Sequence, residues 1–121
     1  MQTVTEDSDQ CPLSEAALLL SSKWDLIVVY NLLDGPHHFN RLKEKISIPL
    51  PKELTSATLS RSLKKLEIDG LAQRNVKSEV GQPVEILYSL TKKGEELEPV
   101  ISELYKWSQK WIRSASQHHT N

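Results

Sequence analysis

The sequence predicts a mostly α-helical domain that carries one small β-hairpin. Apolar residues recur at helical spacing in four segments before residue 70 and in one long segment after residue 91. Between these segments the helical spacing of apolar residues stops, and two short runs typical of β-strands follow. A segment that contains Gly81 and Pro83 joins the two runs. Helices followed directly by a two-stranded hairpin are the layout of a winged helix-turn-helix, which is therefore the expected architecture.

The composition is that of one globular domain. The chain has 121 residues, 38% hydrophobic and 26% charged, which excludes wholesale disorder. The apolar run 26–30, which no other run exceeds in length, is far shorter than the roughly 20 residues of a membrane span, and the first residues lack the pattern of a signal peptide. Because Cys11 is the only cysteine, no internal disulfide can form, and we expect a cytoplasmic protein without a membrane partner. The expected organisation is a disordered tail over 1–10, the domain over 11–113 and a flexible tail over 114–121.

Three short helices are expected before residue 47. Cys11-Pro12 introduces a helix that runs to about residue 20 and is broken by Ser21-Ser22, which can cap the next helix. That second helix, 23–33, ends at the turn Asp34-Gly35-Pro36. Apolar residues at i, i+3 and i+7 predict a third helix over about 39–45.

The most regular helical pattern lies at residues 55–69. The preceding loop, 47–54, contains two prolines two residues apart, which exclude a regular helix there. Three leucines then recur at i, i+4 and i+7: Leu59, Leu63 and Leu66. Thr55 or Ser56 can cap the start of this helix, and Gly70 can cap its end.

A hairpin and a final helix complete the expected fold. Residues 71–76 and 84–90 read as its two strands, and Thr91 caps the final helix, whose apolar stretch spans 95–113. Its large apolar residues, called here the apolar seam, alternate at spacings of three and four: Leu97, Val100, Leu104, Trp107 and Trp111.

The polar face of the 55–69 helix has the pattern of a DNA-reading surface. Opposite the buried leucines lie small or hydroxyl residues followed by three cations: Ser56, Ala57, Thr58, Ser60, Arg61, Lys64 and Lys65. Small residues let a helix enter the major groove, hydroxyls contact phosphates or bases, and Arg61 can bind guanine with two hydrogen bonds. Residues 41–93 hold eleven bases and six acids, whereas the flanking segments are acidic. A solvated basic face is the alternative, but the hairpin that follows favours DNA.

Several motifs together resemble the HxlR-type winged-helix transcriptional regulators over residues 11 to about 112. They are Cys11-Pro12, Lys23-Trp24, Leu33-Asp34-Gly35-Pro36, Phe39-Asn40-Arg41-Leu42, Thr58-Leu59-Ser60, the run 63–71, and Tyr88-Ser89-Leu90-Thr91-Lys92-Lys93-Gly94. The resemblance implies a small dimeric regulator that pairs through its terminal helices and binds double-stranded DNA. For such a dimer we expect a palindromic operator.

The chain departs from the family pattern in three places. The loop 47–54 is longer than usual, which affects the angle at which the next helix meets DNA. The hairpin is also slightly longer, and its tip, Gly81-Gln82-Pro83, lacks an arginine, so Lys77 and Gln82 are the expected wing contacts and the wing is expected to bind weakly. Ser21-Ser22 replaces a pair of glycines, with little expected consequence.

The apolar seam is too hydrophobic to face water alone. We expect it to form a homodimer interface together with Leu18 of the first helix, and packing of the tryptophans on the domain's own core is the alternative. Trp24 is expected to pack in the core, with a role at an interface or ligand pocket as the alternative.

Cys11 is a candidate redox switch, because it precedes a helix and the resemblance places an oxidant-sensing cysteine there in some family members. A helix N-terminus favours the reactive thiolate, but nearby acidic residues oppose it. With one cysteine per chain, a disulfide can form only between chains. A small residue that packs against the dimer helix is the alternative.

No catalytic or metal-binding arrangement stands out, so no enzyme, metal or cofactor is expected. Asp25 and Asp34 read as isolated carboxylates at helix ends. Four histidines are expected to be exposed to solvent: His37, His38, His118 and His119. The rival function is a winged-helix module that contacts proteins without binding an operator, and the salt dependence of duplex binding would separate the two. The sequence identifies no small-molecule effector.

Overall fold

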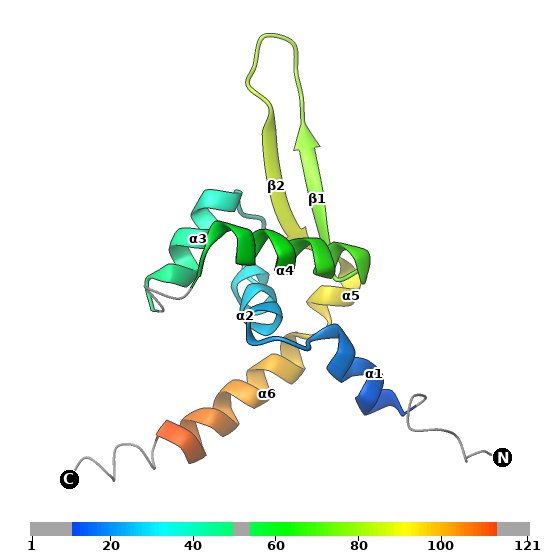
Figure 1. The fold of residues 1–121 in the computed structure, drawn as a ribbon, viewed down its shortest axis with the longest axis vertical. Helices are drawn as coiled ribbons and strands as arrows, with labels where there is room; N and C mark the ends of the chain where they lie inside the picture. Colours follow the sequence, from blue (N-terminus) through cyan, green and yellow to red (C-terminus); the bar gives the residue numbers. More distant parts are fainter. Residues whose placement is uncertain (1–10, 50–53, 114–121) are drawn as a thin grey trace, which may run out of the picture.

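A computed structural model of the chain describes residues 11–49 and 54–113 (Figure 1). Its elements are α1 (Pro12–Leu19), α2 (Lys23–Leu32), α3 (Phe39–Ser47), α4 (Ser56–Ile68), β1 (Ala72–Lys77), β2 (Glu85–Leu90), α5 (Lys92–Glu95), α6 (Glu98–Ser108) and a π-helical segment, Gln109–Arg113. The β1–β2 hairpin stands out from the helices as a wing, and α1 and α6 extend away from the body on the opposite side (Figure 1). The winged helix-turn-helix architecture is therefore confirmed, with α3 and α4 as the helix pair. No helix within the described ranges is long and apolar enough to span a membrane.

The expected tails at 1–10 and 114–121 lie outside the described residues, as does 50–53 of the expected loop. At the start of that loop α3 continues through Ser47, two residues beyond its expected end. Leu42 and Ile46 on α3 are both buried in the core, which stabilises this last turn.

Ser22 starts α2 as expected, through a reciprocal cap. The Ser22 hydroxyl accepts a hydrogen bond from the Asp25 amide (3.2 Å), and the Asp25 carboxylate accepts one from the Ser22 amide (3.3 Å). By contrast, α1 contributes no fully buried residue; its last residue, Leu19, and the C-cap Leu20 pack partly against the core.

Helix α4 is fixed at both ends and along its inner face. Leu59, Leu63 and Leu66 are fully buried, as the periodicity predicts. Thr55 caps the start by accepting from the Thr58 amide (3.1 Å). Gly70 adopts a φ of 77° after the last turn, so that the Leu71 amide donates back to the Leu66 carbonyl (2.8 Å). This bond turns the chain directly into β1.

The wing is an antiparallel pair in which Ala72 lies opposite Leu90 and Lys77 opposite Glu85. His37 adds a single antiparallel bridge to Tyr88 on the outer side of β2, through two backbone hydrogen bonds of 2.9 and 2.8 Å. His37 is therefore part-buried, and the expectation that it is solvent-exposed is wrong, because its backbone joins the sheet. The bridge attaches the turn before α3 to the base of the wing.

The expected final helix is divided into two, which corrects the prediction of one continuous helix. Thr91 caps the short α5 by accepting from the Gly94 amide (3.2 Å). Gly94 is buried against the chain before β1, where a Cβ atom would overlap the Leu71 carbonyl. The second helix, α6, begins at Glu98 with Pro99 in its first turn, a position where a missing backbone N–H costs nothing.

Candidate nucleic-acid interface

The outer face of α4 gathers most of the predicted DNA-contacting residues. Those exposed to solvent are Ser56, Ala57, Ser60, Arg61 and Lys64. Thr58 lies beside them and is half-buried. Small side chains at the start of the helix and long cations further along give a surface that can enter a groove and still reach base edges or phosphates.

Arg61 lies on this face with its side chain already oriented. Its Nη2 donates a long hydrogen bond to the Thr58 hydroxyl oxygen (3.4 Å), which also accepts from the Thr55 hydroxyl (2.9 Å). A guanidinium held by one contact has four N–H groups left for an external acceptor. The geometry therefore suits a bidentate contact to a base or a phosphate.

Lys64 and Lys65 are adjacent in sequence but face different surroundings. Lys64 is exposed, and its ammonium makes no hydrogen bond or ion pair with any residue in the described ranges. Lys65 is half-buried, and its ammonium points inward to α1 and α2. Only Lys64 of this pair is placed to meet a phosphate.

Sequence reasoning missed a cation on α3. Lys43 donates to the Ser56 hydroxyl (2.9 Å) at the N-terminus of α4, so its ammonium lies beside the outer face. Arg41 is also exposed on α3. The first helix of a helix-turn-helix crosses the DNA backbone. The basic residues of α3 could therefore have been predicted from the sequence as candidate phosphate contacts.

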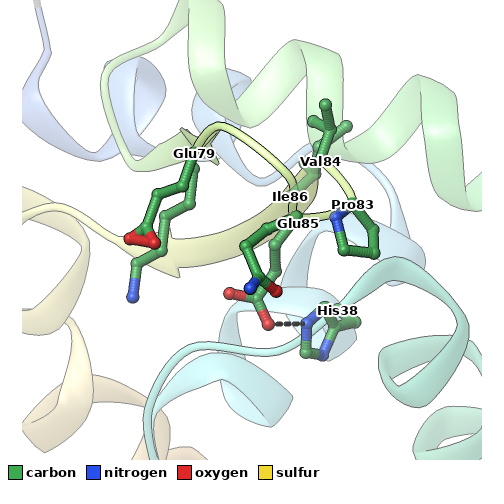
Figure 2. Close-up of a pocket in the computed structure, with 8 residues that line it drawn as sticks. His38, Glu79, Pro83, Val84, Glu85 and Ile86 are labelled. Carbon is green, nitrogen blue, oxygen red and sulfur yellow. Dashed lines mark hydrogen bonds and ion pairs between the residues drawn. The ribbon is translucent and has the colours of Figure 1, made fainter.

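The wing offers a less favourable surface. Lys77 and Gln82 line a hollow on the wing together with Glu79 and Glu85, and His38 also lines it. Figure 2 shows this hollow, with the His38 ring directed at the Glu85 carboxylate (2.9 Å). Two carboxylates thus accompany the single cation Lys77, which weakens any attraction for phosphate.

The apolar seam lies on the surface of α6 and the π-helical segment. Val100, Leu104, Trp107 and Trp111 are each 46–59% exposed, and Leu18 on α1 is 69% exposed. Leu97 differs, because it packs partly against the domain's own core. Beside the seam lies an apolar groove between α2 and α6, whose lining includes Ile27, Tyr30, Leu104, Tyr105 and Trp107. Trp24 packs against the core, as expected.

Cys11 is exposed at the N-cap position of α1, where its side chain makes no capping hydrogen bond. Glu15 lies in the first turn of the same helix. Among the residues that the structure describes, no three His, Cys, Asp or Glu side chains are grouped so that they could hold a metal ion.

The two aspartates predicted to be isolated both have partners. Asp25 is buried and bonded to Ser62 on α4, which local sequence could not show because the two are 37 residues apart. Asp34 accepts a 2.7 Å hydrogen bond from Lys45. That bond, together with the nearby positive charge, holds the pKa of the Asp34 carboxyl below its usual value, although desolvation acts in the opposite direction.

Comparisons with known proteins agree with this geometry. The family described as HxlR-like helix-turn-helix matches residues 19–116. The chain is 41% identical over 106 residues to the HTH-type transcriptional regulator YvaP of Bacillus subtilis, covering 87% of this chain and 92% of YvaP. The reduced form of the B. subtilis transcriptional regulator YodB aligns with a TM-score of 0.66 and 32% identity, over 85% of this chain and 95% of YodB. The reduced form of the redox regulator HypR aligns with a TM-score of 0.70 and 30% identity, over 83% and 92% of the two chains.

Proposed function

The chain belongs to the HxlR-like helix-turn-helix family and is a transcriptional regulator of that type, and on this premise we propose that it binds a palindromic DNA operator as a homodimer. The observation that carries the proposal is the outer face of α4, where exposed cations follow small polar residues. In this proposal residues 11–113 act as one DNA-binding unit, without catalytic activity.

Each residue of the interface has a distinct proposed role. Arg61 reads a guanine through two hydrogen bonds to its major-groove edge. Lys64 and Lys43 bind phosphates on either side of the groove. Ser56, Thr58 and Ser60 supply hydroxyl contacts, and Ala57 lets the helix approach closely; these complete the proposed surface.

The proposed dimer forms through the seam residues of α6 together with α1. It is supported by the exposure of Trp107 and Trp111 and by the apolar groove beside them, since contiguous apolar surface of this kind usually marks an interface. A two-fold dimer presents two copies of α4 to half-sites about 10 base pairs apart.

Selection of bound sequences from a random duplex pool tests the DNA-binding proposal. A palindrome with half-sites about one helical turn apart is the expected result. Affinity for it is expected to fall about 10³–10⁵-fold between 50 and 200 mM salt if six to ten phosphates are contacted. Enrichment of no sequence, with weak binding of every duplex, would instead support a module that contacts proteins.

Sedimentation of Leu104→Glu tests the dimer. The charge lies in the centre of the seam and is expected to give monomers at micromolar concentration, because burying an unpaired carboxylate is unfavourable. Val80→Glu, in the exposed turn of the wing, is the matched control and should sediment as the wild type does. A wild-type chain that is itself monomeric at this concentration would contradict the proposal.

We further propose that Cys11 makes operator binding responsive to oxidants. Support comes from its exposure at a helix N-terminus and from the similarity to HypR, which is named as a redox regulator. Two Cys11 thiols from two protomers lose two protons and two electrons to diamide, which is reduced to the hydrazine, and an interchain disulfide forms. Diamide should change the operator affinity of the wild type and not that of Cys11→Ser. An equal response of both proteins would leave Cys11 with a packing role only.

A further inference from the structure

Lys65 lies on the recognition helix, but its ammonium is occupied by the rest of the protein. Nζ donates to the carbonyl oxygens of Leu18 (3.1 Å) and Leu19 (2.8 Å) and lies 3.2 Å from Oδ2 of Asp25. An ammonium group has three N–H donors, so these three acceptors are enough to occupy all of them. Asp69, one turn further along α4, adds a carboxylate at 3.5 Å. Lys65 is therefore directed away from DNA.

Asp25 is the buried centre of this arrangement, with only 2% of its surface exposed. Its Oδ1 accepts a 2.7 Å hydrogen bond from the Ser62 hydroxyl of α4, and its Oδ2 accepts from the Ser22 amide that begins α2. Buried charges persist only when they are paired and hydrogen-bonded, and Lys65 supplies the opposite charge. Two residues of α4, Ser62 and Lys65, are thus tied to one carboxylate of α2.

The two carbonyls bound by Lys65 belong to the last turn of α1. The final carbonyls of a helix have no partner within it and carry the negative end of the helix dipole, so a cation there is favourable. These two hydrogen bonds tie the end of α1, which has no fully buried residue, directly to α4.

We propose that Lys65 is a positioning residue that couples α1 to the orientation of α4, and not a phosphate contact. The proposal rests on the proposed function, in which α4 reads DNA and α1 belongs to the dimer interface. A displacement of α1 removes two of the acceptors that hold Lys65, leaves its ammonium to Asp25 and Asp69, and so changes the restraint on the turn of α4 that carries Lys65. Operator binding, which fixes α4, in turn restrains α1, since coupling between two sites is reciprocal.

The first test compares Lys65→Met with Lys64→Met on the selected operator and on a non-operator duplex, well below the melting temperature. Lys65→Met should lower operator affinity about 5- to 150-fold, the usual range of coupling, while leaving non-operator affinity and the salt slope unchanged. Lys64→Met should weaken both duplexes and reduce the salt slope by about 0.9, because it loses a phosphate contact. A purely stabilising Lys65 would lower the melting temperature without changing the operator to non-operator ratio, which would overturn the proposal.

The second test is hydrogen exchange of the α1 amides. Operator binding should slow exchange in α1 of the wild type and of Lys64→Met but not of Lys65→Met. Lys65→Met leaves the buried Asp25 carboxylate without its cation. If this variant does not fold, the double variant Asp25→Asn/Lys65→Met, which removes both charges, replaces it in both tests. It should show the same loss of operator preference and of α1 protection.

The outcomes separate this proposal from the function on which it rests. A wild type that binds no duplex specifically overturns the proposed function and the coupling with it. A wild type that binds its operator, with a salt slope lowered equally by Lys64→Met and Lys65→Met, overturns the coupling alone.

Discussion

The recognition helix α4 and the wing are the two elements proposed to meet DNA, and they differ in what surrounds their cations. On α4, Arg61 and Lys64 are exposed, and neither forms an ion pair with a residue in the described part of the chain. On the wing, Lys77 shares a hollow with Glu79 and Glu85. Although both elements are proposed to meet DNA, the charges around their cations indicate that they contribute unequally to DNA binding.

The two elements are nevertheless both held firmly at their bases. Buried leucines and a capped end fix α4, and the wing is anchored by the bridge from His37 to Tyr88 and by the packing of Phe39 on the Tyr88 ring (centroids 6.4 Å apart). The difference lies in charge and not in rigidity. We therefore expect α4 to supply most of the affinity and specificity for DNA, and the wing to contribute little binding free energy.

The largest expected effect is that of Arg61→Ala. Loss of a bidentate contact to guanine should cost about 1–3 kcal/mol of operator binding and relax selectivity at one base pair of each half-site. Lys77→Ala on the wing is the matched control and should cost less than about 0.5 kcal/mol, because neighbouring carboxylates already offset its charge. Binding isotherms on the operator and on duplexes changed at one position measure both quantities. Equal losses in the two variants would remove the proposed difference between helix and wing.

The next effect is on salt dependence. Lys43→Ala should lower the slope of log affinity against log salt by about 0.9, because a phosphate contact releases about that number of counterions. This substitution also tests whether α3 belongs to the interface, which the sequence did not predict. The slope for Lys77→Ala should match that of the wild type. A slope for Lys43→Ala that does not change would restrict the interface to α4.

The contrast between Lys64 and Lys65 shows which features of α4 can be predicted from the sequence and which cannot. Helical periodicity correctly predicted the buried leucines of α4 and its exposed face, because a repeat of 3.6 residues is a local property. The partners of Lys65 on α1 lie 46 and 47 residues away in sequence, and no local pattern reports them. The bridge from His37 to Tyr88 was missed for the same reason. The break before α6 was predictable in principle, because Pro99 marks the first turn of a helix.

A smaller effect is expected when the wing is made less acidic. Glu79→Gln removes one carboxylate beside Lys77 and should raise affinity for every duplex by less than about 1 kcal/mol, the energy of two unit charges about 4 Å apart in water. The gain should disappear at high salt, since exposed charges are screened. Glu103→Gln on α6, away from both elements, controls for the change in net charge. No gain relative to this control would mean that the wing tip does not approach DNA.

The smallest expected effect concerns the turn that anchors the wing base. Lys45 lowers the pKa of the Asp34 carboxyl, so the Asp34–Lys45 pair stabilises the folded state. Because the folded pKa is lower than the unfolded one, this stabilisation is fully present above the unfolded value near 4 and is lost as pH falls through the folded value. Asp34 is 64% exposed, so solvent screens the pair and the contribution should be a few tenths of a kcal/mol. In urea unfolding at pH 7, Asp34→Asn should therefore be slightly less stable than the wild type, and the difference should vanish as pH falls through the lowered pKa of the folded Asp34. A deficit that persists unchanged at low pH would show that the carboxyl supports the turn through shape and not through its charge.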